Sequence, residues 1–528
     1  MKNDLPVQQP SGTETARLRK LAVEYGMDFV DILPDDAIDP SLVGKLPVEW
    51  ARTNNLLPVK INNRLCVLTS DPGNVRQQEY LALLIGNELF PVLAPKELIN
   101  RSIERCYYSK DDSPDEFLRD LSVGTELKER SLTTTDDLLQ VAEKAPVTQL
   151  VNLVLLEAVK RNASDIHFEP LESRLRIRYR IDGVLYEQAS PPKHVEEALV
   201  SRLKVMSHMD IAERRLPQDG MARVRVGERE IDIRVSTIPV AEGERVVLRL
   251  LNRDSSLLPL SVLGLADSTL MSFETLLNEP NGIIVVSGPT GSGKTTTLYA
   301  ALGKLDGSRK NIMTIEDPIE YQLSNISQIQ VKPKIGLTFA AGLRHILRQD
   351  PDIVLVGETR DTETASIAVR ASLTGHLVFT TLHTNDAPSA VLRLVDMGVE
   401  PYLLASCLRG VLAQRLIRKL CTECRRKTVL DKLELKSLAS YEKQLTGHNA
   451  WIPTGCAACL EGYKGRCGVF EFLVFDRDMQ DVVRTGNAGI DTLRKLAKDK
   501  GMVTLLEDGI SKVLSGKTSL AEVISVAL

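Results

Sequence analysis

The chain has 528 residues, 43% hydrophobic and 26% charged, which is typical of a globular protein with about three or four domains. Its net charge of −4 and its aromatic content of 4% argue against a long nucleic acid as the main partner, which would need a basic surplus and base-stacking side chains. No apolar run is long enough to span a membrane, and residues 1–20 lack the apolar segment of a secretory signal, so we expect a cytoplasmic protein.

The first part of the chain predicts a small domain between a tail and a linker. Residues 1–15 are polar, which predicts a disordered tail. Residues 16–108 have the pattern of a small α/β domain, and residues 109–140 are charged and lack a sustained apolar face, as linkers do. The elements expected in the domain are a hairpin of two strands (56–60 and 65–69) that turns at Asn62 and Asn63, and a helix after Asp71-Pro72-Gly73.

Residues 141–265 predict a second α/β domain. Pro146 begins a helix whose apolar residues recur at helical spacing from Val147 to Val159. Strands are expected at 164–168, 175–180, 183–187, 221–226, 230–236 and 245–251. The domain is rich in arginine, with Arg214, Arg215, Arg223, Arg225, Arg229, Arg234, Arg245 and Arg249. Most of these cations suit solvated strand faces, but one or two of them can instead reach a nucleotide held by a neighbouring subunit.

A phosphate-binding motif follows an apolar, β-branched run that predicts a strand. From Gly288 the sequence is GPTGSGKT, the pattern G-x-x-x-x-G-K-[ST]. The glycines allow successive N–H groups to turn inward, and the helix expected from Lys294 adds its own N–H groups and its dipole. The Lys294 ammonium suits the β- and γ-phosphates, and the Thr295 hydroxyl can bind Mg²⁺. The candidate nucleotide contacts are Gly288, Pro289, Thr290, Gly291, Ser292, Gly293, Lys294, Thr295 and Thr296.

Residues 266–420 alternate apolar strands with helices, which predicts a parallel sheet covered on both faces. The expected strands are 282–287, 311–315, 353–356 and 377–381. Three of them end in polar clusters, at the edge where such sheets bind ligands. The candidate residues after these strands are Glu316, Asp317 and Glu320 in the first cluster, Glu358 in the second and His383 in the third.

These clusters suit the hydrolysis of a bound triphosphate. Glu358 can orient an attacking water. Gly357 occupies the place where similar enzymes commonly have an aspartate, so we expect contact with a metal-bound water to come from Glu316, Asp317 or Glu320. His383 and His376 can hydrogen-bond the γ-phosphate, although a histidine in a core is also commonly just packed.

Four clustered cysteines predict a metal site in residues 421–460. The C-x-x-C pairs Cys421/Cys424 and Cys456/Cys459 can place four thiolates around one tetrahedral ion, which suits Zn²⁺ in a structural role. A redox pair or a zinc-free variant is the alternative. The other cysteines, Cys66, Cys106, Cys407 and Cys467, are isolated, which predicts buried thiols. Residues 461–528 predict a mainly helical region.

The motifs resemble those of the type II secretion ATPases, the E proteins of the general secretion pathway, which form a superfamily with type IV pilus motors. The matching segments are ASDIHFEP (163–170), RRLPQDG (214–220), ERVVLR (244–249), the phosphate loop, an Asp box (316–321), LRQDPD (347–352), VGETRD (356–361) and a His box (374–385). They are dense from about residue 145 to 474 and weak before residue 111. Gly357 is normal for this family, whereas Thr359 replaces a residue that is usually apolar.

The resemblance implies a homo-hexameric ring on the cytoplasmic face of the bacterial inner membrane. Each subunit would have an N-terminal partner-binding domain, a PAS-like middle domain, a RecA-like ATPase core and a tetracysteine zinc subdomain. Glu358 would be the catalytic carboxylate for ATP hydrolysis, and Arg215, Arg234 and Arg245 are the candidates to complete the site. The N-terminal domain would dock onto the cytoplasmic domain of an inner-membrane secretion protein, and the ring would work with an inner-membrane platform protein in pseudopilus assembly.

We therefore expect an ATP-hydrolysing motor of type II secretion. The nearest alternative is a type IV pilus assembly ATPase, which shares the chemistry, although residues 244–251 and the long spacer between the cysteine pairs favour secretion. A DNA translocase or helicase could use the basic residues near the cysteines, but the net charge argues against it. A phosphate-loop kinase would need an acceptor site, which we do not find in the sequence.

Overall fold

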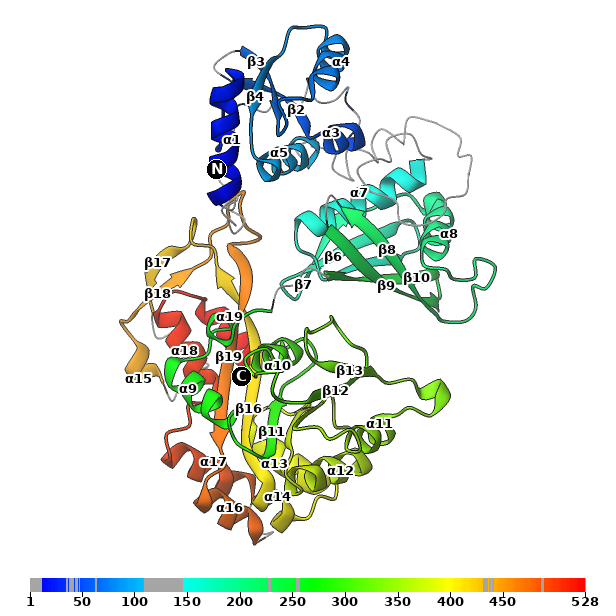
Figure 1. Ribbon diagram of the computed structural model, residues 1–528. Helices are drawn as coiled ribbons and strands as arrows, with labels where there is room; N and C mark the ends of the chain where they lie inside the picture. Colours follow the sequence, from blue (N-terminus) through cyan, green and yellow to red (C-terminus); the bar gives the residue numbers. More distant parts are fainter. Residues whose placement is uncertain are drawn as a thin grey trace. The chain divides into compact units, whose positions relative to one another are not determined.

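A computed structural model describes residues 12–34, 37, 42, 46, 48–61, 64–108, 146–226, 229–252, 257–430, 435, 438, 441–485 and 489–527. The chain divides into two compact units, Met1–Asp254 and Ser255–Leu528 (Figure 1). The predicted linker, the turn at Asn62 and Asn63 and residues 1–11 of the predicted tail lie outside the described residues. The first helix begins at Gly12, so it includes the end of the segment for which we expected a disordered tail.

The N-terminal domain is built on a four-stranded sheet in the order β1-β4-β3-β2. Its elements are α1 (Gly12–Tyr25), β1 (Asp28–Phe29), α3 (Val48–Asn54), β2 (Leu56–Ile61), β3 (Arg64–Thr69), α4 (Val75–Ile85), β4 (Phe90–Leu93) and α5 (Lys96–Tyr108). Strands β2 and β3 pair antiparallel, with Leu56 opposite Thr69, which confirms the predicted hairpin. The helix expected after the Asp71 turn is α4, and the Asp71 carboxylate accepts a hydrogen bond of 2.9 Å from the Gly73 N–H.

The middle domain is an antiparallel sheet in the order β7-β6-β5-β10-β9-β8, with helices α7 and α8. Its elements are α7 (Pro146–Lys160), β5 (Asp165–Pro170), β6 (Leu175–Ile181), β7 (Val184–Ala189), α8 (Glu196–Met206), β8 (Gln218–Val226), β9 (Arg229–Val240) and β10 (Gly243–Asn252). The apolar face predicted for α7 is buried, and the buried Tyr179 hydroxyl on β6 donates to the Val154 carbonyl at 2.7 Å. This domain is the expected PAS-like α/β domain.

The second unit contains a seven-stranded sheet in the order β13-β12-β14-β15-β11-β16-β19. Its strands are β11 (Gly282–Ser287), β12 (Ile312–Glu316), β13 (Ser327–Gln330), β14 (Ile353–Val356), β15 (Leu377–Leu382), β16 (Leu408–Leu420) and β19 (Tyr463–Val474). The pairs from β13 to β16 are parallel, and only the β16–β19 pair of this sheet is antiparallel. The four predicted strands are therefore confirmed, and they form the RecA-like core.

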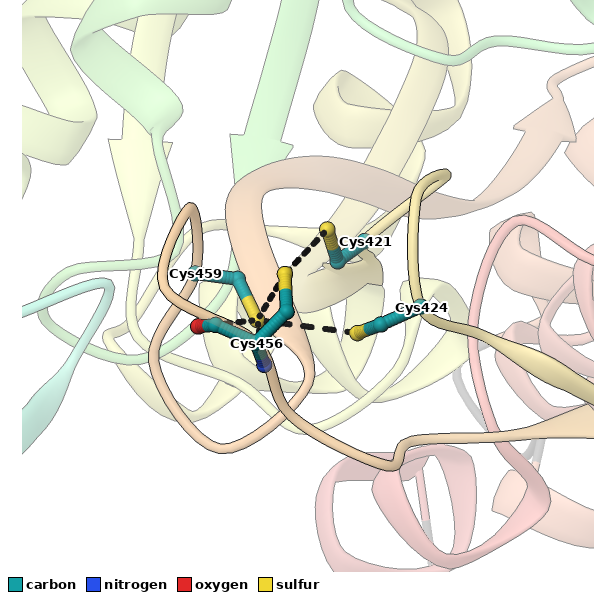
Figure 2. A group of neighbouring side chains, drawn as sticks. All are labelled: Cys421, Cys424, Cys456 and Cys459. Atoms are coloured by element: carbon teal, nitrogen blue, oxygen red, sulfur yellow. Dashed lines mark hydrogen bonds between the residues drawn. The ribbon is translucent and has the colours of Figure 1, made fainter. Parts of the chain in front are cut away.

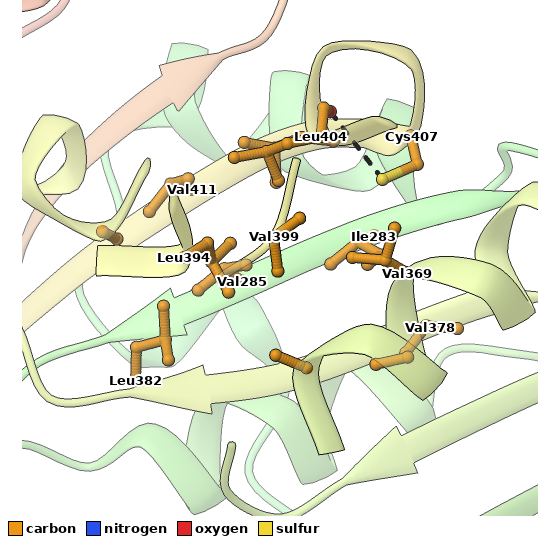
Figure 3. Close-up of a cluster of buried hydrophobic side chains, with 14 of the residues drawn as sticks. Ile283, Val285, Val369, Val378, Leu382, Leu394, Val399, Leu404, Cys407 and Val411 are labelled. Atoms are coloured by element: carbon orange, nitrogen blue, oxygen red, sulfur yellow. Dashed lines mark hydrogen bonds between the residues drawn. The ribbon is translucent and has the colours of Figure 1, made fainter. Parts of the chain in front are cut away.

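Helices cover both faces of this sheet, because successive residues of a strand point to opposite sides. Ile283 and Val285 of β11 belong to one buried cluster (Figure 3), and Ile284 and Val286 belong to another. The helices around the sheet are α9 (Asp267–Leu276), α10 (Lys294–Leu302), α11 (Phe339–Ile346), α12 (Thr362–Leu373), α13 (Ala387–Asp396) and α14 (Pro401–Cys407).

Strand β19 differs from the sequence prediction, because it lies in the region for which we expected mainly helices. It pairs with β16 from Gly410 opposite Val474 to Leu420 opposite Tyr463, so the cysteine-containing lobe is an insertion between two neighbouring strands. The lobe contains β17 (Arg426–Val429), α15 (Glu442–Leu445) and β18 (Asn449–Ile452). The expected helices follow as α16 (Arg477–Arg484), α17 (Ile490–Asp499), α18 (Leu505–Leu514) and α19 (Leu520–Ala527). In the part of the chain that the structure describes, no helix has the length and apolar character that crossing a membrane requires.

Glu471 of β19 joins two helices to the sheet. The residue is 4% exposed, and its carboxylate accepts the Ala387 N–H at the start of α13 (2.8 Å) and the Leu505 N–H at the start of α18 (3.3 Å). Both N–H groups belong to first turns, which have no partner within their own helix. Burial raises the pKa of the Glu471 carboxyl.

We expect Glu471→Ala to lower the free energy of unfolding by about 2–4 kcal/mol, because each buried N–H group that loses its acceptor costs about 1–3 kcal/mol. Glu471→Gln should lose less, since its amide oxygen still accepts a hydrogen bond. Urea denaturation of the two variants and the wild type measures the difference. Equal midpoints for all three proteins would show that this carboxylate does not stabilise the unit.

Candidate functional site

The phosphate-binding loop follows β11 and leads directly into α10. Gly288, Gly291 and Gly293 have φ values of 151°, 79° and 87°, which side chains rarely allow. A Cβ atom at Gly288 would also lie 2.4 Å from the Gln414 carbonyl oxygen. Helix α10 begins at Lys294 and has no side-chain cap, so its first N–H groups are available to a phosphate. The buried Ser292 hydroxyl has no hydrogen-bond partner among the described residues, as expected for a group that meets a ligand.

Two polar side chains shape this loop. Lys294 Nζ donates to the carbonyls of Gly288 (2.8 Å) and Pro289 (3.1 Å), and burial lowers its pKa to about 8, against the opposing charge of Glu358. Gln414 of β16 accepts a hydrogen bond from the Thr297 hydroxyl (2.8 Å) and donates to the Ser292 carbonyl (2.7 Å). Sequence reasoning missed Gln414, although a buried glutamine within an apolar strand is the kind of signal that could have indicated it.

Glu358 and His383 meet at the carboxyl ends of β14 and β15. His383 Nε2 lies 3.0 Å from one Glu358 oxygen, and an Arg360 nitrogen lies 2.6 Å from the other. Burial raises the pKa of the Glu358 carboxyl, but the hydrogen bond and charge of Arg360, with the charges of His383 and Lys294, lower it overall. Burial and the Lys294 charge lower the pKa of His383. The Glu358 carboxylate is thus ionised and lies in a cationic environment.

The acidic residues after β12 separate into two kinds. Asp317 and Glu320 are exposed, and Asp317 interacts electrostatically with Arg360. Glu316, in contrast, is 4% exposed and is hydrogen-bonded to Tyr299, Thr314 and Gln328. Because the Glu316 oxygens already accept three hydrogen bonds, the exposed Asp317 and Glu320 suit contact with a metal-bound water better.

Close packing explains Gly357, and a buried hydrogen bond explains Thr359. A Cβ atom at position 357 would lie 3.1 Å from the Ile315 carbonyl oxygen and 3.2 Å from the Glu316 Cα, so an aspartate there would need the neighbouring backbone to move. Thr359 is buried, and its hydroxyl shares a hydrogen bond of 2.7 Å with the Thr380 hydroxyl. The Thr359 hydroxyl therefore has a hydrogen-bond partner although the residue is buried.

His376 is not part of this site. It precedes β15, whereas His383 follows it, and its carbonyl accepts the Gly282 N–H at the amino end of β11. The phosphate loop lies at the opposite, carboxyl end of β11. The prediction that His376 contacts the γ-phosphate in its own chain is therefore wrong, because the length of a strand separates the two.

The middle-domain arginines predicted to reach a nucleotide have different surroundings. Arg215 is 89% exposed on the loop before β8, where it pairs with Glu213. Arg245 donates to the buried Glu169 carboxylate at 2.7 Å, which also binds two other arginines. Arg234 lies directly opposite Arg249 on neighbouring strands, and both line a hollow of about 450 Å³. Sequence reasoning missed the pairing with Arg249, because it depends on the register of β9 and β10.

The four cysteine sulfurs converge in the inserted lobe, all within 4.8 Å of one another (Figure 2). Three of the Sγ–Sγ distances are 3.9 Å for Cys421–Cys456, 3.7 Å for Cys424–Cys459 and 3.6 Å for Cys456–Cys459. Tetrahedral coordination with Zn–S bonds of about 2.3 Å requires edges of about 3.8 Å, so the cluster fits a zinc ion. Cys66 and Cys407 are buried as predicted, Cys467 is only half-buried, and the Cys106 side chain lies outside the description.

Comparisons with known proteins match nearly the whole chain. The family described as Type II/IV secretion system protein matches residues 140–525, and the family described as MshEN domain matches residues 25–113. Type II secretion system protein E of Dickeya dadantii is 46% identical over 92% of this chain and 98% of its own length. The type IV pilus assembly ATPase PilB of Myxococcus xanthus is 41% identical over 96% of this chain and 89% of its own length.

A solved structure supports the fold. The X-ray structure of the ATPase DotB of Legionella pneumophila has a TM-score of 0.53 and 22% identity, and the match covers 75% of this chain and 97% of that one. The resemblance inferred from the motifs is confirmed by these matches. The chain belongs to the family of type II/IV secretion system proteins.

Proposed function

We propose that this protein is the ATP-hydrolysing motor of a type II secretion system. The observation that carries the proposal is the meeting of Glu358 and His383 beside the phosphate loop, at the carboxyl edge of one parallel sheet. The extensive identity to a type II secretion system protein E supports the choice of machine. The motor would convert ATP to ADP and phosphate and use the released energy for pseudopilus assembly and protein export, at the cytoplasmic face of the inner membrane.

Different residues of the site would bind the phosphates, hold the metal ion and activate the water. The loop N–H groups and Lys294 would bind the β- and γ-phosphates, and Thr295, Asp317 and Glu320 would offer the oxygen donors that Mg²⁺ prefers. A bound Mg²⁺ would neutralise phosphate charge. Glu358 orients a water molecule and accepts its proton as the water oxygen bonds to the γ-phosphorus. The bond from the γ-phosphorus to the bridging oxygen then breaks, and ADP keeps the electron pair.

The middle domain would supply cations to the nucleotide of a neighbouring subunit in a hexameric ring. Arg234 is a candidate because it lines the hollow on β9 and β10, directly opposite Arg249. Arg245 and Arg249 are bound to the buried carboxylates of Glu169 and Asp165, which would have to release them first. The N-terminal domain would bind the cytoplasmic domain of an inner-membrane secretion protein, and the ring would act on the inner-membrane platform protein.

The cysteine cluster would hold Zn²⁺ in a structural role, because four protein thiolates leave no open coordination position.

A second candidate function is type IV pilus assembly, favoured by the 41% identity to PilB over most of both chains. The two functions share the chemistry described above. Complementation of secretion and pilus mutants with this chain distinguishes them.

We expect Glu358→Ala to bind ATP with near wild-type affinity and to hydrolyse it at least about 100-fold more slowly, because the general base is lost. Lys294→Ala should lose ATP binding while remaining folded. Nucleotide binding by calorimetry and phosphate release measure the two steps separately. Appreciable turnover by Glu358→Ala would show that another group activates the water.

A mixture of two inactive variants tests whether arginines act between subunits. Arg234→Ala keeps its phosphate loop and Lys294→Ala keeps its arginine, so about a quarter of the interfaces in randomly mixed rings would be complete. We expect the mixture to regain hydrolysis. A mixture of Lys294→Ala with Glu358→Ala is the control and should stay inactive, because both residues act within one chain. An inactive first mixture would argue against supply from a neighbour.

We expect Cys456→Ala to release zinc and to lower the thermal stability of the inserted lobe, since the ion cross-links both cysteine pairs. The matched control is Cys467→Ala, which removes a thiol outside the cluster. Elemental analysis should find about one zinc per chain in the wild type and in the control. Full zinc content in Cys456→Ala would show that the ligand set is different.

A further inference from the structure

A buried hydrogen-bond network at the end of β12 has no part in the hydrolysis described above. Its centre is Glu316, whose two oxygens have different partners. One oxygen accepts the Thr314 hydroxyl at 2.6 Å and a Gln328 amide N–H at 3.1 Å. The other accepts the Tyr299 hydroxyl in a short hydrogen bond. Burying a carboxylate costs free energy unless hydrogen bonds stabilise its charge, as they do here. We therefore asked what a buried carboxylate contributes at this position.

The network joins the helix of the phosphate loop to the acidic segment. Tyr299 belongs to α10, the helix that begins with Lys294. Gln328 of β13 donates to the Tyr321 carbonyl (3.2 Å) and accepts the Leu323 N–H (2.7 Å). The rings of Tyr299 and Tyr321 also meet edge to face, with centroids 4.7 Å apart. The segment that carries Asp317 and Glu320 is therefore attached to α10 on its inner side.

The centre of this connection, Glu316, is held in place by its neighbours. The Glu316 carbonyl accepts the Val331 N–H at 2.9 Å, and Gly357 packs against the Glu316 backbone so closely that a Cβ atom would be 3.2 Å from its Cα. Burial and the Glu316 charge raise the pKa of Tyr299, so its hydroxyl keeps its proton and remains a donor. The Glu316 carboxylate thus lies in a defined position between α10 and the segment that carries Asp317 and Glu320.

We propose that Glu316 is a positioning residue which, through Tyr299 and Gln328, holds the acidic segment with Asp317 and Glu320 in register with the phosphate-loop helix. The inference rests on the proposed function for its effect on hydrolysis. In this proposal Glu316 does not contact the nucleotide or Mg²⁺ itself, whereas Asp317 and Glu320 do. A shift of α10 when phosphates bind at its N-terminus would be transmitted to the acidic segment through this network.

Two variants and their combination test the proposal in the full chain. Tyr299→Phe keeps the ring and removes the hydroxyl, and Glu316→Gln keeps the shape and removes the charge. We expect each to lower kcat by about 10-fold, on the order of one lost hydrogen bond to a buried charge. The double variant should lose no more than either single variant, because one network is broken in all three. The Mg²⁺ concentration for half-maximal activity should rise by a similar factor in both single variants, because Asp317 and Glu320 lose their positioning in both.

The matched control is Tyr441→Phe, which removes a tyrosine–glutamate hydrogen bond of 3.1 Å to Glu507 elsewhere in the same unit. It should leave kcat unchanged. A rise of 10-fold or more in the Mg²⁺ requirement of Glu316→Gln alone would overturn the proposal and make Glu316 a ligand. Unchanged kcat in Tyr299→Phe and Glu316→Gln would also overturn it, while hydrolysis by the wild type would leave the proposed function standing.

Amide hydrogen exchange, measured without nucleotide, tests whether the network holds the acidic segment in place. This test works even if the wild type does not hydrolyse ATP. We expect Tyr299→Phe to speed exchange in residues 317–323 and to leave β11 protected as in the wild type. Tyr441→Phe should change neither region. Unchanged exchange in residues 317–323 would overturn the proposal independently of any activity.

Discussion

Fully buried parallel strands end at one edge of their sheet, and the candidate nucleotide site depends on this constraint. Strands β11, β14 and β15 are buried along their whole length, and their few polar residues lie toward their carboxyl ends. The phosphate loop and Glu358 therefore reach the same edge from distant parts of the sequence. The order of the strands puts β15 between β11 and β14, which is why His383 can contact Glu358.

Strand β16 connects the site with the cysteine lobe. Gln414, in the middle of this strand, holds the phosphate loop through Thr297 and Ser292, and Cys421 follows directly after its end. Strand β19 returns from the lobe and pairs along β16, while Glu471 fixes two helices to it. A metal ion in the lobe would thus stabilise the connection between β16 and β19, at some distance from the chemistry.

Carboxylates decide which cations are available in the middle domain. Glu169 binds Arg245 together with two other arginines, and Glu213 binds Arg215. Asp165 binds Arg249 at 2.9 Å, and Arg249 and Arg234 line one hollow. The arginines of this domain are therefore mostly bound to carboxylates, as expected for strand faces with solvent access.

The sequence by itself determined the features that depend on local spacing: the phosphate loop, the two cysteine pairs and the apolar strands of the core. Only the tertiary structure decided that Glu358 and His383 meet, that Glu316 and His376 do not join them, and that Arg249 stands beside Arg234. It also decided that residues 463–474 form a strand, because the partner that stabilises them, β16, lies before the inserted lobe. These outcomes depend on strand order, register and burial, which bring together residues that no local pattern relates.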